Sequence, residues 1–180
     1  MIYNEGWYPY SVEYEQEDSC PELSSSSAEY YRSSNWELSA QSDSQLMELK
    51  CDQWNSDWVN VDDVYLYWSI ALQNLGKFEE SEKVLTKGLN ELPENTTLMT
   101  RLAYAYKKQG KIDEMIIEYE RLMDSGSDDI DSLRDLASAY GKQGRVDEQI
   151  SVLKKILNID PNNSSVQSEL ARVYEDSGED

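Results

Sequence analysis

The central part of the chain carries a pattern of apolar and polar positions that repeats every 34 residues. Without any gap, the pattern gives three successive units: residues 62–95, 96–129 and 130–163. In the first half of each unit, apolar side chains fall at i, i+3 and i+7, the spacing of one face of an amphipathic helix. The aligned positions hold Tyr65, Met99 and Leu133, then Trp68, Leu102 and Leu136, then Leu72, Tyr106 and Tyr140. The first half of each unit is therefore predicted to be an α-helix.

A glycine ends each of these predicted helices, and the second half of each unit has its own apolar face. The glycines are Gly76, Gly110 and Gly144. In the first unit the second face contains Leu85 and Leu89, which lie four residues apart. Small side chains occupy the position where two helices can approach closely, namely Ser69, Ala103 and Ala137. Each unit is therefore predicted to be an antiparallel pair of helices joined by a tight turn.

The ends of the units carry helix-capping residues. Side chains of Asn and Asp favour the N-cap position because they accept hydrogen bonds from free backbone N–H groups. The predicted N-caps are Asn60, Asn95, Asp129 and Asn163. Residues 164–180 supply only the first helix of a fourth unit, with Leu170, Ala171 and Tyr174 in register. They are predicted to form a C-terminal capping helix over the last apolar face.

The stretch LASAYGKQGRVDEQISVLKKILNIDPNN resembles a tetratricopeptide repeat, and the resemblance covers about two thirds of the chain. It implies an all-α, right-handed superhelical solenoid of antiparallel helical hairpins. It also implies binding of a protein or peptide on the concave wall formed by the first helices. The second helices depart from the family, which usually has alanine where this chain has Ser81, Met115 and Gln149. Wider helix packing is expected there.

Positions beside the core stripe of the first helices are predicted to line the concave groove. They are Leu66, Ile70, Thr100, Arg101, Tyr104, Arg134, Ser138 and Arg172. Some family members hold acidic chaperone tails with a clamp of lysine, arginine and asparagine, and that pattern is missing here, where the wall also carries Asp131 and Asp135. An extended or helical peptide with apolar anchors and some positive charge fits this mixture.

Residues 1–61 have another character, with 12 acidic and 2 basic residues, a run of four serines and four of the five tryptophans. Two interpretations remain open for residues 1–41: a disordered interaction segment, or a segment docked on the solenoid. The aromatic stretch that could act as a linear motif contains Trp7, Tyr8 and Tyr10. Residues 42–61 are predicted to cap the first unit through a helix from Ser42 to Lys50, which begins at a capping box.

The charge balance narrows the class of partner. The chain has 36 acidic and 16 basic residues, a formal net charge of −20. This disfavours direct binding of nucleic acid or an anionic membrane surface, and a basic protein is the natural complement. The same acidity also fits a protein that only needs to stay soluble. The alternative function is an acidic decoy or inhibitor of a basic, nucleic-acid-binding protein.

No constellation of residues predicts catalysis, a metal site or a cofactor. The chain has no histidine, which removes the usual metal ligand and proton shuttle. Cys20 and Cys51 are too few for a disulfide framework and are expected to be free thiols in a reducing compartment. No secretory signal or membrane-spanning run is apparent, so a cytoplasmic location is expected. The oligomeric state stays open, including a homo-oligomer.

Overall fold

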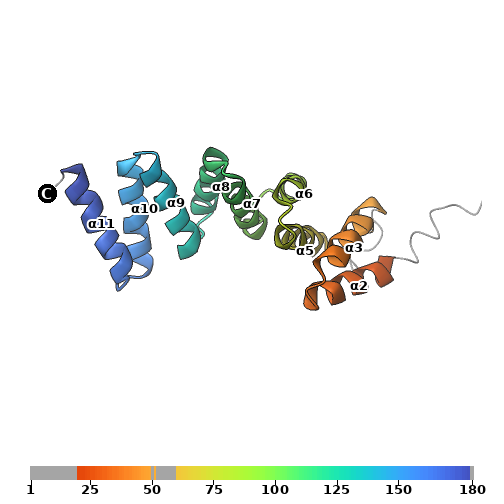
Figure 1. The fold of residues 1–180 in the computed structure, drawn as a ribbon. Coiled ribbons are helices and arrows are strands. Elements are labelled where there is room, and N and C mark those ends of the chain that lie inside the picture. Colours follow the sequence, from red (N-terminus) through yellow and green to blue (C-terminus); the bar gives the residue numbers. More distant parts are fainter. Residues whose placement is uncertain (1–19, 50, 52–59, 179–180) are drawn as a thin grey trace, which may run out of the picture. The chain divides into compact units, whose positions relative to one another are not determined.

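The computed structural model describes residues 20–49, 51 and 60–178, and all regular structure in these residues is helical (Figure 1). The helices are α2 (Cys20–Arg32), α3 (Trp36–Glu48), α5 (Val61–Asn74), α6 (Phe78–Glu91), α7 (Thr96–Gln109), α8 (Ile112–Asp124), α9 (Ile130–Lys142), α10 (Val146–Ile159) and α11 (Ser164–Ser177). The chain divides into two compact units, Met1–Val84 and Leu85–Asp180. The predicted fold class, all-α and built from helical hairpins, is confirmed.

In the first unit, α2 and α3 form a hairpin and α3 packs against α5. The ring of Tyr31 in α2 lies 5.7 Å from that of Trp36 in α3 and 4.4 Å from that of Tyr67 in α5, measured between ring centroids. The carboxylate of Asp43 is buried in this hairpin and accepts hydrogen bonds from the hydroxyl groups of Ser27 and Ser39. The hairpin interface therefore combines aromatic packing with a buried polar cluster.

The predicted helix from Ser42 to Lys50 begins earlier than expected. The N-cap of α3 is Asn35, whose side chain accepts a hydrogen bond from the backbone N–H of Leu38. Ser42 is buried inside α3 and is not a cap. A second helix, α2, forms within residues 1–41, and the boundary proposed at residue 41 falls inside α3. The aromatic stretch around Trp7 lies outside the described residues.

The expectation of free thiols is wrong, because Cys20 and Cys51 form a disulfide bond with a Cα–Cα distance of 5.7 Å. Both residues are fully buried. They are separated by 31 positions in the sequence. The antiparallel course of α2 and α3 brings the first residue of α2 next to the segment that follows α3. The pairing therefore depends on tertiary structure and not on a local motif.

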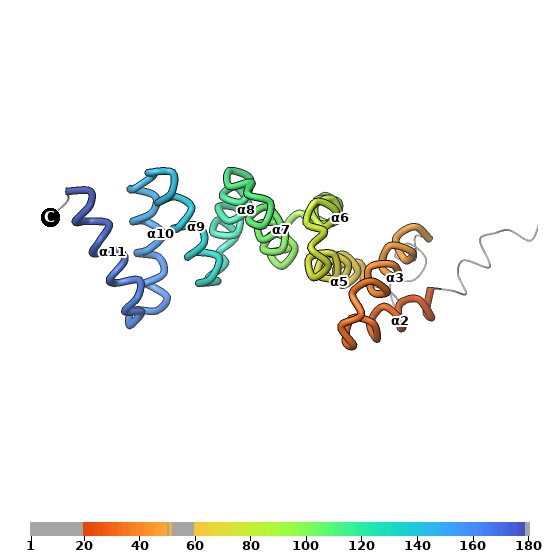
Figure 2. The backbone as a smooth tube through the Cα atoms, in the orientation of Figure 1, coloured from red at the N-terminus to blue at the C-terminus, as the bar shows by residue number. Residues whose placement is uncertain are grey.

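The second unit contains the hairpins α7–α8 and α9–α10, with α11 packed on α10 (Figure 2). Its core is formed by the predicted apolar stripe together with further positions in the second helices. Leu98, Leu136, Leu153 and Ile156 are fully buried. In α11, however, Val166 and Val173 are the buried residues, while Leu170 is half-buried and Ala171 is exposed. No helix in the described residues is long and apolar enough to cross a membrane.

The predicted caps and turns are confirmed. The side chains of Asn60, Asn95, Asp129 and Asn163 each accept a hydrogen bond from a backbone N–H in the first turn of the following helix. The backbone at Gly110 is left-handed, with φ of 74°, and its N–H donates to the carbonyl of Lys107. This conformation favours glycine because a Cβ atom is strained there.

Gln149, one of the larger residues of the second helices, is accommodated by a small residue across its hairpin. Gln149 is buried against Gly141, where an added Cβ would lie 2.8 Å from the Gln149 side chain. At the equivalent positions of the repeat at residues 62–95 the sizes are reversed, and Gln73 donates a hydrogen bond of 3.1 Å to the small Ser81. In these two repeats a large side chain on one helix is thus matched by a small one on the other.

Candidate functional site

An open groove of about 520 Å³ lies in the second unit on the side of α7 and α9, the first helices of two successive hairpins. We call it the α7–α9 groove. Its lining residues come from α7, α8, the following turn and α9. They are Thr96, Thr97, Thr100, Arg101, Tyr104, Tyr119, Ser127, Asp129, Asp131, Ser132 and Asp135. Each wall is positioned by a helix with an asparagine or aspartate N-cap, Asn95 for α7 and Asp129 for α9.

The two walls of the groove differ in charge. The α7 wall carries three threonines, Arg101 and Tyr104, and has no acidic residue in its first turn. The ammonium group of Lys108 lies 5.2 Å from the centroid of the Tyr104 ring. The α9 wall carries carboxylates, namely Asp129, Asp131 and Asp135. A ligand in the groove therefore meets hydroxyl, aromatic and cationic groups on one side and anionic groups on the other.

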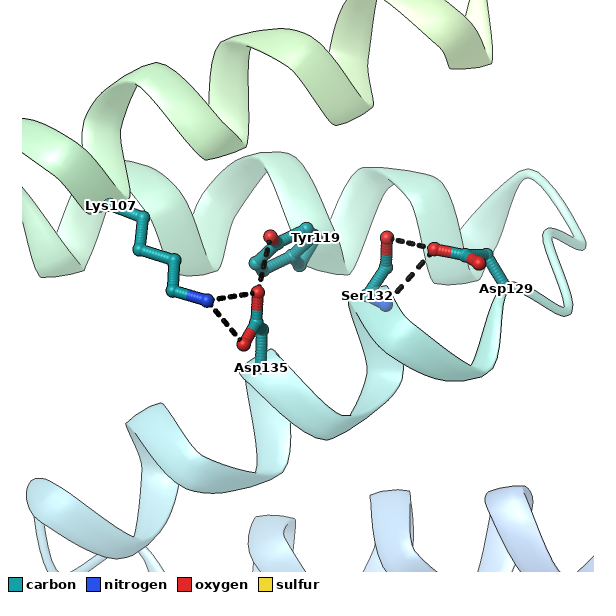
Figure 3. A network of polar contacts seen from close by, with 5 residues as sticks. All are labelled: Lys107, Tyr119, Asp129, Ser132 and Asp135. Atoms are coloured by element: carbon teal, nitrogen blue, oxygen red, sulfur yellow. Dashed lines mark hydrogen bonds and ion pairs between the residues drawn. The ribbon is translucent and has the colours of Figure 1, made fainter.

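Asp135 is held by residues from two other helices (Figure 3). Its carboxylate oxygens each lie 2.7 Å from the ammonium nitrogen of Lys107, and the hydroxyl of Tyr119 donates a 3.0 Å hydrogen bond to it. Burial raises the pKa of Tyr119, and the charge of Asp135 raises it further, so the phenol stays protonated as a donor. Because the Lys107–Asp135 pair is partly exposed, it contributes at most about 1 kcal/mol. Its main effect is to fix the position of the α9 wall relative to α7 and α8.

The other two carboxylates of the α9 wall have different roles. Asp129 is engaged as the N-cap, because the backbone N–H and the hydroxyl of Ser132 both donate to it (Figure 3). Asp131 is exposed and forms no hydrogen bond or ion pair with another described residue. Asp131 is therefore the carboxylate of this groove that is available to a ligand.

The structure places the predicted groove residues in several locations. Thr100, Arg101 and Tyr104 line the α7–α9 groove. Ser138 lines a separate small cavity of about 50 Å³ beside Lys107. Three further residues belong to other surfaces of the second unit or to the first unit: Arg134, exposed and bonded to Ser165; Arg172, exposed on α11; and Leu66, half-buried on α5. Ile70, also on α5, is only 8% exposed.

Sequence reasoning missed several residues that line the groove, among them Thr96, Tyr119, Asp129, Ser127 and Ser132. The ring of Tyr119 is buried, as the apolar spacing of a second helix predicts, but its hydroxyl reaches Asp135. Asp129 was predicted only as a cap. Ser127 and Ser132 carry no pattern that separates them from other turn and helix serines. The described residues contain no group of three or more histidine, cysteine, aspartate or glutamate side chains that could hold a metal ion.

Comparison with known proteins supports the repeat and the fold. Two segments, residues 96–125 and 131–163, match the family model of the tetratricopeptide repeat. The predicted unit 62–95 is not part of that match, although α5 and α6 form within it. No curated protein sequence matches the chain.

Among solved structures, the chain is similar to several of the protein MamA. One MamA structure aligns with a TM-score of 0.75 at 13% identity, covering 90% of this chain and 85% of that one. MamA from Desulfovibrio magneticus RS-1 aligns with a TM-score of 0.70 at 16% identity, covering 90% and 87%. MamA from AMB-1 aligns with a TM-score of 0.67 at 21% identity, covering 93% and 83%. At these identities the likeness establishes the fold alone.

Proposed function

We propose that this chain, which carries tetratricopeptide repeats at residues 96–125 and 131–163, binds a peptide or a segment of a partner protein in the α7–α9 groove. The repeat is a protein-interaction fold, so the general class of protein–protein interaction module follows from the family. The observation that carries the finer proposal is the open groove itself, whose walls come from the first helices of two matched repeats.

The chemistry of the groove favours a ligand with a basic residue and an apolar anchor. Tyr104 and Arg101 belong to the residue types that most often dominate binding energy at interfaces. Asp131 offers an unengaged carboxylate on the opposite wall. A lysine or arginine of the ligand pairs with Asp131 in this arrangement, while an apolar side chain packs on the Tyr104 ring. The protein then acts as an adaptor, scaffold or chaperone-like module, without catalysis of its own.

Affinity capture with matched variants tests this proposal. The groove variant combines Tyr104→Ala with Asp131→Asn, and the control is Ile117→Ala, which truncates an apolar side chain of α8 that is 53% exposed and does not line the groove. Quantitative mass spectrometry should show that partners captured by the wild-type protein are lost from the groove variant and retained by the control. Circular dichroism should show equal helix content in all three proteins. Full retention of every partner by the groove variant would show that the groove assignment is wrong.

The acidic decoy is the second candidate, and the net charge of −20 is the observation that favours it. A decoy presents carboxylates over a wide surface, so its binding should weaken steeply with added salt and should be indifferent to Tyr104→Ala. Groove binding predicts a weak dependence on salt and a clear loss of affinity in the Tyr104→Ala protein. Titration of a captured partner against both proteins at two salt concentrations separates the two functions.

The cytoplasmic location is a hypothesis drawn from the sequence. The Cys20–Cys51 disulfide opposes it, because disulfides persist mainly in oxidising compartments. Rapid acid quenching of cells followed by thiol alkylation measures the state of the two cysteines. A cytoplasmic protein should be recovered with both thiols alkylated, and an oxidised pair in living cells would contradict the hypothesis.

A further inference from the structure

A second open groove lies in the first unit, between the two helices of the N-terminal hairpin. Its volume is about 520 Å³. The lining residues come from the first turns of α2 and from the end of α3: Glu22, Leu23, Ser26, Gln45, Glu48 and Leu49. We call this surface the α2–α3 groove. Leu23 and Leu49 are half-buried and give it an apolar floor, while Glu22 and Glu48 are exposed on its rim.

The charge around this groove is negative. None of the described residues that line it is basic. Residues 20–51 contain two basic residues, Arg32 at the opposite end of α2 and Lys50, against Glu22, Glu29, Glu37 and Glu48 besides the buried Asp43. A cationic ligand is therefore the electrostatic complement of the groove.

The position of Glu48 adds an independent argument. Glu22 lies in the first turn of α2, where the helix dipole favours an acidic residue, so the dipole alone explains why a glutamate stands there. Glu48 is the last residue of α3, where the dipole favours a cation, and that turn has no basic residue. Its only hydrogen bond among the described residues is a long one, 3.4 Å from the hydroxyl of Ser44. A basic residue of a ligand at this helix end would interact favourably with both the Glu48 carboxylate and the helix dipole.

We propose that the α2–α3 groove is a docking site for a basic amphipathic helix of a partner protein. An apolar side chain of that helix enters between Leu23 and Leu49. Lysine or arginine residues one turn before and after it pair with Glu22 and Glu48. This is the helix-in-groove mode of recognition, in which apolar anchors recur at helical spacing. The proposal concerns a different surface from the α7–α9 groove and does not depend on it.

The disulfide holds this groove in its open form. Cys20 lies two residues before Glu22, and Cys51 lies two residues after Leu49, so the bond joins the two walls at the end of the hairpin where the groove lies. A wall spacing fixed before binding lowers the ordering cost of association. The oxidised protein is therefore the form that binds most tightly.

The test measures fluorescence anisotropy of a labelled synthetic amphipathic helix made of leucine and lysine, titrated with the full-length protein at physiological salt. Because Glu22→Gln with Glu48→Gln removes both rim carboxylates that pair with the cations of the peptide, this double variant should raise Kd about tenfold. The matched control, Glu29→Gln with Glu37→Gln, removes the same charge from the same hairpin outside the groove and should change Kd by less than about twofold.

Three further comparisons test the apolar floor, the location of the site and the residue order of the peptide. Leu23→Ser should weaken binding, whereas Leu38→Ser, at an exposed leucine of α3 outside the groove, should not. The Tyr104→Ala, Asp131→Asn protein should bind the peptide like wild type, because its altered surface is the α7–α9 groove. A peptide of the same composition in scrambled order should bind more weakly.

Several results would overturn the proposal. An equal rise in Kd for the Glu22→Gln, Glu48→Gln protein and the Glu29→Gln, Glu37→Gln protein would mean that the affinity depends only on the overall charge of the hairpin. Wild-type affinity in the Leu23→Ser protein, or equal binding of the scrambled peptide, would also contradict a defined groove. Removing the disulfide with Cys20→Ser and Cys51→Ser should raise Kd several-fold while circular dichroism shows the helices retained. Unchanged affinity of that variant would contradict the role of the disulfide.

Discussion

Replacing Asp43 with asparagine should stabilise the first unit more at pH 8 than at pH 5. Asp43 is 1% exposed, between Ser27 of α2 and Ser39 of α3, and both hydroxyls donate to it. Burial raises its pKa from 3.8 to about 7, although the two hydrogen bonds act in the opposite direction. The charge of Asp43 acts on Tyr67, whose pKa is raised first by burial and further by nearby charges that include Asp43. Asparagine keeps an acceptor for Ser27 without the charge.

The sign follows from comparing folded and unfolded states. Because the folded pKa lies above the unfolded value, the folded protein holds more protons than the unfolded chain between about pH 4 and pH 7. The stability contribution of Asp43 therefore falls as pH rises through this window and is constant above it. Each pKa unit is worth about 1.4 kcal/mol, so two units between pH 5 and pH 7 give about 2–3 kcal/mol. The Asp43→Asn substitution removes this pH dependence.

Urea unfolding followed by tryptophan fluorescence measures the effect, because Trp36 and Trp68 lie in helices of the first unit and no tryptophan lies in the second unit. The free energy of unfolding of Asp43→Asn minus that of wild type should rise by about 2–3 kcal/mol from pH 5 to pH 8. The control Glu37→Gln, at an exposed position of α3, should change stability by less than about 0.5 kcal/mol at both pH values. A difference for Asp43→Asn that does not change with pH would refute the reasoning.

Three further predictions concern the second unit, each measured by urea unfolding with far-ultraviolet circular dichroism. Leu136→Ala, at a fully buried position, should cost about 2–5 kcal/mol, and a cost below about 1 kcal/mol would contradict its place in the core. Gly141→Ala should stabilise by less than the about 1 kcal/mol that alanine brings at an open helix position, because its Cβ displaces the flexible end of the Gln149 side chain; in a Gln149→Ala background the gain should reach about 1 kcal/mol, and an equal gain in both backgrounds would contradict the contact. Asp129→Ala should cost about 1 kcal/mol through loss of the α9 N-cap, whereas Asp128→Ala should be nearly neutral.

The features that could be predicted from the sequence are those that depend on local physics. The cap at Asn95 and the left-handed turn at Gly110 follow from the geometry of helix ends. The 34-residue repeat places a cap and a glycine at the same positions in successive repeats, which strengthens the prediction. The buried stripe through Leu136 follows from helical spacing. The register of the first helix decides which side chains lie beside the core stripe. The sequence could therefore place Thr100, Arg101 and Tyr104 on the surface that lines the groove.

The features that could not be predicted depend on contacts between distant parts of the chain. The Cys20–Cys51 bond requires the antiparallel course of α2 and α3, which the serine-rich stretch of α2 does not indicate. The hydrogen bond from Tyr119 to Asp135 joins two helices through a hydroxyl at the edge of a buried ring. The spacing of apolar residues predicts that the ring is buried but does not predict the partner of its hydroxyl. Asp131 stands out as unengaged only after the partners of its neighbours are known.

The claim that the α7–α9 groove binds the partner can be tested directly by photocrosslinking in living cells. A photoreactive amino acid is placed at Tyr104, inside the groove, and in a second protein at Ile117, on an exposed part of α8 outside it. Binding in the groove should give a defined crosslinked partner from position 104 that is absent from position 117. The same partner crosslinked equally from both positions, or only from position 117, would contradict it.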